Sequence, residues 1–421
     1  MLQLTDRDRG LLDGTYGPGA QMAMSIMVRM AEVYGAETLL DISAAHIDSA
    51  LYMGQATLDF AERLAGLGAR VVVPATTNVS GVDEAGWRAW PVPPEWAEMA
   101  QRQMAAYLAL GCSPTFTCAP YQSAPRPHFG QQIAWGESNA IAFANSVLGA
   151  RTERYPDLLD ICAAITGRVP LVGLHLTENR AASLVLRLDG VPLALQAADE
   201  FYPVLGYVTG RLAGERVPAI DGLAVVPTED QLKALCAAAA SSGAVALCHV
   251  VGVTPEASTL DAACQGRVPP ELHVLDMAVL RRAAAALTTA DTGALDLVAL
   301  GCPHFSLAEF RQLAPLLAGR KRSPRTRFLV TTGRSVAEWA EQEGLLEPLA
   351  AFGGELTLDT CILTTPMLPS DVRCLMTNSA KYAYYAPGML NTTVTYGSLS
   401  DCVRSAVAGA VVRDGSLWEG E

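Results

Sequence analysis

The sequence has few basic residues for its size. Its 421 residues include 30 lysines and arginines against 43 aspartates and glutamates, and the formal net charge is −13. Proteins that bind nucleic acid need clusters of basic side chains, because contacts to phosphates dominate their affinity, and the sequence has no such cluster. We therefore expect no nucleic-acid partner. A small substrate is not excluded, since a site can be locally basic on an acidic protein.

The sequence also has no recognisable secretory signal or membrane-spanning run. Its start, "MLQLTDRDRGLLDG", has no apolar core after a basic segment. The longest nearly uncharged stretch, residues 234–253, is divided by Ser241, Ser242 and Gly243 into an alanine-rich helix and a strand. We therefore expect a cytoplasmic protein with no membrane partner. In that compartment the ten cysteines are expected to be thiols or metal ligands rather than a disulfide framework.

Aromatic residues are scarce, at 6%, although hydrophobic residues as a whole make up 50% of the chain. This composition suits helices packed on sheets and does not suit a disordered chain. There is no repeat of fixed period, no low-complexity tract and no long charge run. A length of 421 residues predicts about two or three domains.

Strand and helix patterns alternate most clearly in the C-terminal third. The predicted strands there are 295–301 ("LDLVALG"), 327–333 ("RFLVTTG"), 356–363 ("LTLDTCIL"), 372–378 ("VRCLMTN") and 392–397 ("TTVTYG"). Helical patterns separate most of them, and one continuous helix is predicted over 335–354. Such alternation predicts right-handed β–α–β units and a mostly parallel sheet, which is an α/β fold.

Residues 36–43 and 69–78 near the N-terminus are also predicted strands, each ending in a polar loop. Proline and glycine interrupt the central part of the chain often. We expect three lobes, with boundaries near residues 165 and 285. They are an N-terminal α/β lobe at 1–165, a middle lobe at 166–285 and a C-terminal α/β lobe at 286–421.

Three cysteines share one setting, at the end of a predicted strand. Cys118 ends "TFTC" (115–118), Cys302 ends "LVALGC" and Cys361 lies in "LDTC", and a proline follows each within five residues. Open α/β sheets bind ligands in the crevice beyond the carboxyl ends of their strands. Three thiolates there would suit an iron–sulfur cluster or zinc. The alternative is buried, inert thiols, and the absence of any CxxC pair leaves it open.

The other seven cysteines occur in apolar helical or strand patterns, in a loop or at a helix end, and are expected to be structural. They are Cys112, Cys162, Cys236, Cys248, Cys264, Cys374 and Cys402.

Polar side chains gather at three predicted strand ends. They are Asp41, His46 and Asp48 in "DISAAHIDS", Thr76, Thr77 and Asn78 in "VPATTN", and Asn378, Ser379 and Lys381 in "TNSAKY". A carboxylate beside a histidine can orient its imidazole, and the amides of a helix N-terminus together with a lysine form an anion site. Ordinary helix capping with solvated charges explains the same patterns.

A helix predicted within residues 125–154 carries polar residues among apolar ones. Buried polar groups need partners, and either a site or hydrogen bonding between lobes supplies them. The polar residues are Glu137, Ser138, Asn139 and Asn145, and the cationic residues near the candidate loops are Arg126, Arg151 and Lys381.

Six segments together carry a family resemblance. They are "DISAAHIDSALYMG", "FTCAPYQSAPRPHFGQQIAWGESNAIAFANSVLGART", "AAITGRVPLVGLH", "FYPVLGYVTGR", "DLVALGCPHFSLAEF" and "TNSAKYAYYAPGM". In order and content they resemble the large subunit, or catalytic portion, of aconitase X. The resemblance runs from about Leu39 to Cys402.

The resemblance implies an aconitase-like architecture of three α/β lobes with mostly parallel sheets, facing a smaller swivelling domain. That domain is not recognised in this chain, so a small subunit that supplies it, with a catalytic serine, is the expected partner in a heterodimer. The resemblance also implies an iron–sulfur cluster held by Cys118, Cys302 and Cys361. The chain lacks the paired CxxC ligands of ordinary aconitases, which leaves [2Fe–2S], [3Fe–4S] and [4Fe–4S] open.

Members of this family dehydrate small hydroxy acids, so the resemblance implies a hydro-lyase. The bacterial type converts cis-3-hydroxy-L-proline to Δ1-pyrroline-2-carboxylate, and an archaeal type dehydrates phosphomevalonate. Both reactions need a β-hydroxyl to leave as water while a neighbouring carbon loses a proton. An iron with an open position can polarise the hydroxyl, and a positioned base takes the proton. The few cationic side chains favour the amino acid over the phosphate.

For this chain we expect Lys381 and Ser379 to hold the substrate carboxylate. His46 and Asp48 are expected to assist proton movement or to position the cluster. The other expected substrate contacts are Thr76, Thr77, Asn78, Glu137, Asn145, Arg151 and Asn378. The alternatives of another class are a non-catalytic iron–sulfur protein, such as a redox or iron sensor, and a structural zinc protein.

Overall fold

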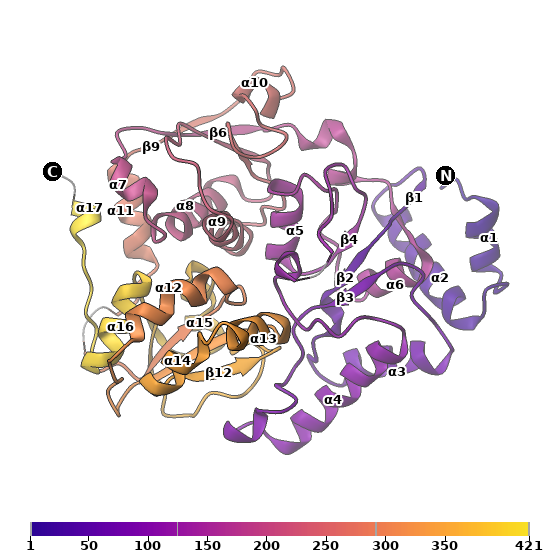
Figure 1. The fold of residues 1–421 in the computed structure, drawn as a ribbon. Helices are drawn as coiled ribbons and strands as arrows, with labels where there is room; N and C mark the ends of the chain where they lie inside the picture. Colours follow the sequence, from indigo (N-terminus) through magenta and orange to yellow (C-terminus); the bar gives the residue numbers. More distant parts are fainter. Residues whose placement is uncertain (1, 124, 291–292, 420–421) are drawn as a thin grey trace.

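The computed structural model describes residues 2–123, 125–290 and 293–419. Three parallel sheets of three, four and five strands follow one another along the chain, and helices pack around them (Figure 1). A short antiparallel pair, β1 with β5, accompanies the first sheet. The predicted α/β class and the mostly parallel sheets are therefore confirmed. The groups of elements around the three sheets are called here the N-terminal, middle and C-terminal lobes.

The N-terminal lobe contains a sheet of order β3-β2-β4. Its elements are α1 (Asp6–Leu12), α2 (Pro18–Val33), β1 (Leu39–Asp41), β2 (Ala45–Ile47), α3 (Gln55–Gly66), β3 (Ala75–Thr77), α4 (Pro94–Ala109), β4 (Ala134–Trp135), α5 (Ser138–Ser146), α6 (Leu159–Thr166) and β5 (Arg168–Pro170), with 3-10 turns η1 (Asp48–Ala50), η2 (Trp87–Ala89) and η3 (Pro120–Gln122). The pairing of β1 with β5 ties the beginning of this lobe to its end.

The middle lobe contains a sheet of order β8-β7-β6-β9. Turns η4 (Gly173–His175) and η5 (Thr177–Arg180) lead into β6 (Leu184–Leu188), α7 (Leu193–Ala197), α8 (Phe201–Ala213), β7 (Pro218–Asp221), α9 (Glu229–Ser242), β8 (His249–Val250), α10 (Leu260–Ala263), β9 (Leu272–Leu275) and α11 (Met277–Ala286).

The C-terminal lobe contains a five-stranded parallel sheet of order β12-β11-β10-β13-β14. Its elements are β10 (Leu297–Leu300), α12 (Leu307–Leu317), β11 (Arg327–Thr332), α13 (Arg334–Gln342), α14 (Leu346–Phe352), β12 (Glu355–Leu358), β13 (Cys374–Thr377), α15 (Ala380–Met389), β14 (Thr393–Tyr396), α16 (Leu399–Ala408) and α17 (Ser416–Glu419). From β10 the chain adds strands first on one side and then, from β13, on the other. The carboxyl ends of β10 and β13 therefore flank a topological switch point, where open α/β sheets form their crevice.

The alanine-rich helix α9 holds the three lobes together. It packs against α5 of the N-terminal lobe, α8 of its own lobe and α15 of the C-terminal lobe. Small side chains permit this close packing: a Cβ atom added at Gly206 of α8 would lie 2.3 Å from the Leu235 carbonyl oxygen of α9. A helix predicted from its alanine content alone therefore lies at the centre of the fold.

Four predicted elements differ from the structure. The strand predicted over 69–78 is only β3 (Ala75–Thr77), and the one predicted over 356–363 ends at Leu358, so Cys361 lies in the loop after β12. Residues 115–118 do not form a strand; they run extended beside β3, joined to it by a bridge from Thr76 to Ser113 and by a 3.1 Å bond from the Thr117 amide to the Thr77 carbonyl. Phe116 has a φ of 39°, which interrupts regular strand geometry. The helix predicted over 335–354 is two helices, α13 and α14, because the chain turns at Gly344, whose φ is +70°.

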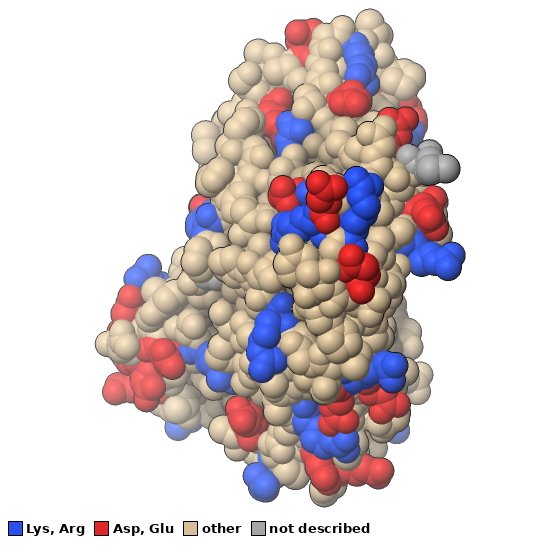
Figure 2. All heavy atoms as spheres, turned by 90° about the vertical axis from the view of Figure 1, so that its right-hand side faces the viewer, with Lys and Arg blue, Asp and Glu red and all other residues tan. Residues whose placement is uncertain are grey.

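Acidic and basic side chains are interspersed on the face shown in Figure 2. Ion pairs on the surface of the protein include Arg7 with Asp41 and Arg102 with Glu62. Among the described residues, no helix combines the length and apolar character needed to cross a membrane.

Candidate active site

The three strand-end cysteines meet between the N-terminal and C-terminal lobes. Cys302 follows β10, Cys361 follows β12, and Cys118 ends the extended segment beside β3. All three are partly exposed, whereas the other seven cysteines are buried. The loops that carry them lie beyond the carboxyl ends of parallel strands, where ligands bind in this fold class.

Electrostatics show that the three thiols are neighbours. Burial, then the charge of Glu137 and more weakly that of Cys361, raise the pKa of Cys118 to about 12, against the opposing effects of Lys381 and the His304 amide. Burial also raises the pKa of Cys302 well above its ordinary value; Lys381 opposes this shift, and Cys361 and Cys118 add to it. A bound cation removes such protons, so these thiols would release protons on binding metal.

The donor set fits an iron–sulfur cluster. Among residues 2–123, 125–290 and 293–419, no group of three potential ligands is close enough to hold a single metal ion. Thiolate sulfur is the usual ligand of an iron–sulfur cluster, and all three side chains are thiols. Cys118, Cys302 and Cys361 would hold the cluster.

A histidine that the sequence reasoning did not assign connects the three cysteine-bearing segments. His304 is buried two residues after Cys302. Its Nδ1 bonds Thr117 Oγ1 at 3.1 Å and its Nε2 bonds the Thr360 carbonyl at 3.0 Å. Its backbone N–H also donates to the Cys118 sulfur at 3.3 Å. Thr117 and Thr360 directly precede Cys118 and Cys361, and His304 follows Cys302 closely. One imidazole therefore links the three segments that carry the thiols. The only sequence signal for a role of His304 was its position two residues after Cys302 in "GCPHF".

Replacing His304 with alanine is expected to loosen the three segments. We expect the affinity of the protein for iron to fall about 10–100-fold, which is the usual cost of removing a residue that orients metal ligands. Iron titration followed by visible absorbance measures this, with His128→Ala, at an exposed histidine, as the control. Unchanged iron binding by the His304 variant would mean that the backbone alone spaces the cysteines.

An ion pair stands beside the thiols. Lys381, in the first turn of α15, contacts Glu137, which precedes α5, with 2.6 Å between Nζ and Oε1. Burial disfavours the charged lysine, but Glu137 and the thiols of Cys302 and Cys118 outweigh it and raise the pKa of Lys381. The structure thus joins a strand end of the N-terminal lobe to a strand end of the C-terminal lobe through Lys381 and Glu137.

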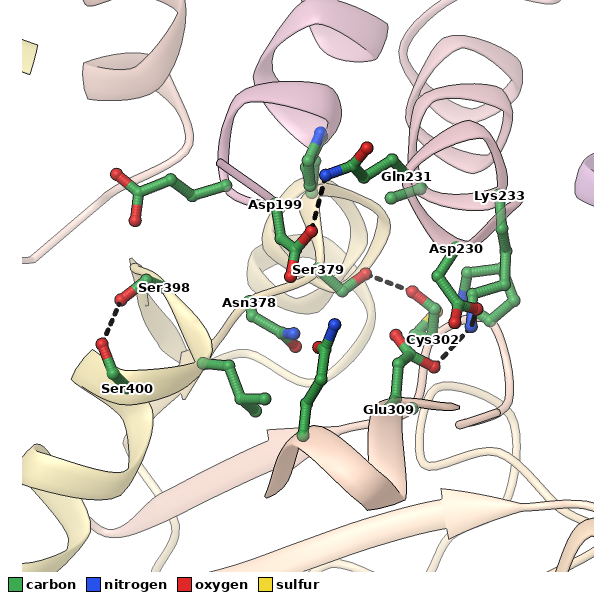
Figure 3. A pocket seen from close by; sticks show the side chains of 18 of the residues that line it. Asp199, Asp230, Gln231, Lys233, Cys302, Glu309, Asn378, Ser379, Ser398 and Ser400 are labelled. Atoms are coloured by element: carbon green, nitrogen blue, oxygen red, sulfur yellow. Dashed lines mark hydrogen bonds and ion pairs between the residues drawn. The ribbon is translucent and has the colours of Figure 1, made fainter. Parts of the chain in front are cut away.

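Ser379 and Asn378 lie at the same strand end. Ser379 caps α15 by accepting a bond from the Tyr382 amide, and its hydroxyl donates to the Cys302 carbonyl at 2.5 Å. Asn378 and Ser379 line a cavity of about 270 Å³ between the middle and C-terminal lobes, shown in Figure 3. The cavity reaches the loop of Cys302.

Charged residues of the middle lobe fix that loop from the other side of the cavity. Lys233 of α9 is buried and pairs with Asp230, at 2.8 Å, and with Glu309 of α12 (Figure 3). Ser306, the N-cap of α12, donates to Asp230 at 2.7 Å. Because the Cys302 loop runs directly into Ser306, these bonds hold one cysteine segment against α9.

Three polar residues lie at the carboxyl ends of the N-terminal sheet. Asp48 follows β2, Asn78 follows β3 and Glu137 follows β4. The Asn78 amide nitrogen donates to Asp48. Burial, and after it the charge of Glu137, raise the pKa of Asp48 to about 8. A Cβ atom at Gly136 would lie 2.5 Å from that of Asp48, so glycine is required for Glu137 to come this close.

His46, Thr76 and Thr77 lie deeper in the same sheet. His46 is fully buried, its Nδ1 bonds Thr76 Oγ1 at 2.8 Å, and burial lowers its pKa to about 3, so the imidazole is neutral. The Thr77 hydroxyl donates to the Ser113 carbonyl at 3.0 Å and accepts from the Phe116 amide. These contacts fix the segment that leads to Cys118.

Two residues expected at the site lie elsewhere. Asn145 bonds Thr152 and the Ala246 carbonyl and accepts from Arg180, at the junction with the middle lobe. Arg151 donates to the His175 carbonyl at 3.0 Å. Asn145 is eight residues from Glu137 along α5, which separates them by about 12 Å at 1.5 Å per residue. The structure therefore does not bring Asn145 and Arg151 together with the thiols.

Comparisons with known proteins agree with this arrangement. Models of the first, second and third domains of aconitase X match residues 1–178, 182–285 and 295–408. The chain is 48% identical over 405 residues to cis-3-hydroxy-L-proline dehydratase of Pseudomonas aeruginosa, covering 96% of this chain and 69% of that protein. It is 39% identical to the large subunit of phosphomevalonate dehydratase of Methanothermobacter thermautotrophicus, covering 94% of this chain and 96% of that subunit.

A solved structure is also similar. The holo-form of Thermococcus kodakaraensis aconitase X superposes with a TM-score of 0.86 at 31% sequence identity, covering 96% of this chain and all of that one. The similarity extends over all three lobes.

Proposed function

Because the chain belongs to the aconitase X family, we propose that it is the catalytic portion of an iron–sulfur-dependent hydro-lyase that dehydrates cis-3-hydroxy-L-proline to Δ1-pyrroline-2-carboxylate. The assignment of this substrate rests on the 48% identity, over 96% of the chain, to a protein named for this reaction. The relatives compared above are named as dehydratases, which favours an enzyme over an iron sensor.

A second candidate substrate is phosphomevalonate. The 39% identity to the large subunit of phosphomevalonate dehydratase, with 96% of that subunit covered, supports it. That relative's name also supports a small-subunit partner for this chain, which would carry the serine proposed to take the substrate proton. The partial exposure of Cys118, Cys302 and Cys361 leaves room for such a partner to cover the site.

The cysteines would hold the cluster, which when bound would supply Lewis-acid activation of the departing hydroxyl. Lys381 keeps its positive charge beside them and would bind the substrate carboxylate. The Ser379 hydroxyl is engaged by Cys302 and Tyr382, so Ser379 positions the Cys302 loop and α15 for that contact. The neutral His46 would position Thr76 and the end of β2 rather than carry charge.

Asp48 would supply the proton that leaves with the hydroxyl. The elimination breaks the bond from the ring carbon to its hydroxyl, and the oxygen takes a proton from the Asp48 carboxyl to leave as water. The adjacent carbon loses its proton to the base, and the enamine formed tautomerises to Δ1-pyrroline-2-carboxylate. With a pKa of about 8, Asp48 retains its proton at neutral pH, as this role requires.

Replacing Asp48 with asparagine is expected to lower kcat by roughly 10²–10⁴-fold, the usual contribution of general acid catalysis. The native enzyme should be active below the Asp48 pKa of about 8 and lose activity as the pH rises through it, because the carboxyl must be protonated to donate. The Asp48→Asn variant should lack that alkaline limb. A pH–rate profile with the same limb in both proteins would assign it to another group.

The proposed function is tested on protein purified without oxygen, together with any subunit that co-purifies. Iron content and visible absorbance are recorded, and cis-3-hydroxy-L-proline and phosphomevalonate are each assayed for loss of water. Turnover of the first by a brown protein supports the proposal. Turnover of phosphomevalonate alone would make phosphomevalonate the substrate in place of cis-3-hydroxy-L-proline. A colourless, iron-free protein after anaerobic reconstitution would overturn the proposal of an iron–sulfur cluster.

A further inference from the structure

Two buried polar atoms just beyond adjacent strand ends of the N-terminal sheet have no hydrogen-bond partner among the described residues. They are Glu137 Oε2 and Asn78 Oδ1. The residues that carry them are only 8% and 2% exposed. Native proteins satisfy nearly all buried polar atoms, so two unsatisfied acceptors at adjacent strand ends point to a bound group.

The two oxygens of the Glu137 carboxylate differ in their hydrogen bonds. Its Oε1 accepts from Lys381 at 2.6 Å and from the Ser138 hydroxyl at 3.1 Å, while Oε2 accepts from no described residue. Glu137 also has a φ of 54°, which is rare for a residue with a side chain. The ion pair therefore fixes one oxygen and leaves the other available.

Asn78 is oriented in the same way. Its amide nitrogen is held by Asp48, so its carbonyl oxygen is the end that remains free. Asp48 is also near enough to Glu137 for the two carboxyl groups to interact. Both free oxygens are acceptors, so each needs a donor, and a single group with two N–H bonds supplies both. A secondary ammonium has two.

The charges around this position also select the ligand. The carboxyl groups that interact with Asp48 are Glu137, Asp157 and Asp160, and Lys381 is the cation paired with Glu137. An ammonium beside a carboxylate group that binds Lys381 matches this pattern, whereas a phosphate dianion would meet the carboxylates.

We propose that Glu137 Oε2 and Asn78 Oδ1 bind the ring ammonium of a zwitterionic cyclic amino acid while Lys381 faces its carboxylate. The Lys381–Glu137 ion pair is then a receptor for both charges of the substrate and selects an amino acid over a phosphorylated acid. This inference rests on the proposed dehydratase function for its substrate class, and the contacts themselves are tested by binding without turnover.

The test compares two ligands that differ at the nitrogen. L-Proline carries the ring ammonium and carboxylate, and cyclopentanecarboxylate carries the carboxylate alone. Their binding to the full chain, purified without oxygen with any co-purifying subunit, is measured by calorimetry. We expect L-proline to bind at least about tenfold more tightly, consistent with a hydrogen bond to a charged group.

The variants Glu137→Gln and Asn78→Leu are each expected to weaken L-proline binding roughly 10–100-fold and to leave cyclopentanecarboxylate binding nearly unchanged. Glu62→Gln, at a surface glutamate paired with Arg102, is the matched control and should change neither. Circular dichroism and thermal melting establish that each variant is folded. Two variants are used because Glu137→Gln also removes the partner of Lys381, whereas Asn78→Leu does not.

The inference would be overturned if both folded variants weakened the binding of the two ligands equally, or weakened the binding of neither. It would also be overturned if the native protein did not bind L-proline. Glu137-dependent L-proline binding without dehydration of cis-3-hydroxy-L-proline would support the ammonium site and remove the proposed reaction. Dehydration of cis-3-hydroxy-L-proline together with L-proline binding that does not depend on Glu137 would support the proposed reaction and remove the ammonium site.

Discussion

Replacing Cys118 with serine is expected to abolish cluster binding and activity together. A serine hydroxyl is a hard, weakly acidic donor and replaces a thiolate poorly as an iron ligand. The loss of iron affinity should exceed the roughly 10–100-fold typical of residues that only orient ligands. Visible absorbance and iron per chain, measured after anaerobic purification, report the cluster, and the dehydration assay reports activity.

Cys264→Ser is the matched control for that experiment. Cys264 is a buried thiol at the end of α10, in the middle lobe, and has no part in the thiol group. It should retain colour and iron. A Cys118→Ser protein that stayed brown and active would remove Cys118 from the ligand set and return it to the role of an ordinary thiol.

Replacing Lys381 with alanine is expected to lower kcat/KM by roughly 10²–10³-fold, comparable with the loss of one preorganised donor from an active site. The change removes the charge proposed to bind the substrate carboxylate and leaves Glu137 buried without its partner. Breaking a buried pair on one side costs about 3–5 kcal/mol of stability. The cluster should remain, because Lys381 is not among its expected ligands.

The double variant Lys381→Met with Glu137→Gln separates the two effects. It removes both charges at once, so most of the lost stability should return while kcat/KM stays low. Thermal melting and steady-state kinetics measure the two quantities. Unchanged kinetics in Lys381→Ala would remove the residue from the site, and parallel loss of iron would make it a residue that positions the cluster.

Strand ends were the most predictable feature of the fold. Apolar runs bounded by glycine or proline placed β10 and β13 to within about two residues and found the start of β12, because alternation of strands and helices leaves a strong local pattern, but β12 ends at Leu358 rather than at 363. The expected strand at 115–118 was wrong. Those residues have strand propensity, but the Thr115 hydroxyl and the Thr117 amide both donate to the Thr77 carbonyl of β3 and hold the segment beside the sheet without a regular ladder.

The candidate site was predictable where its residues follow strands directly. Asp48, Asn78 and Lys381 each come within four residues of a strand end, and the structure gathers them near one another. Asn145 lies at the other end of α5 from Glu137, and its hydrogen bonds reach the middle lobe, which its position in the sequence did not indicate. His304 was missed because its two partners, Thr117 and Thr360, are distant in sequence.

The sequence by itself determined the α/β class, the approximate position of most strands and the residue types that carry the chemistry. These follow from local periodicity and from the chemistry of each side chain. Only the tertiary structure decided which strand ends face one another. It brought Glu137 to Lys381, set His304 between the cysteine segments and left Glu137 Oε2 with no partner in the described part of the chain. The reason is physical: the packing of α9 between the lobes and the strand order around β10 depend on contacts between residues far apart in the chain.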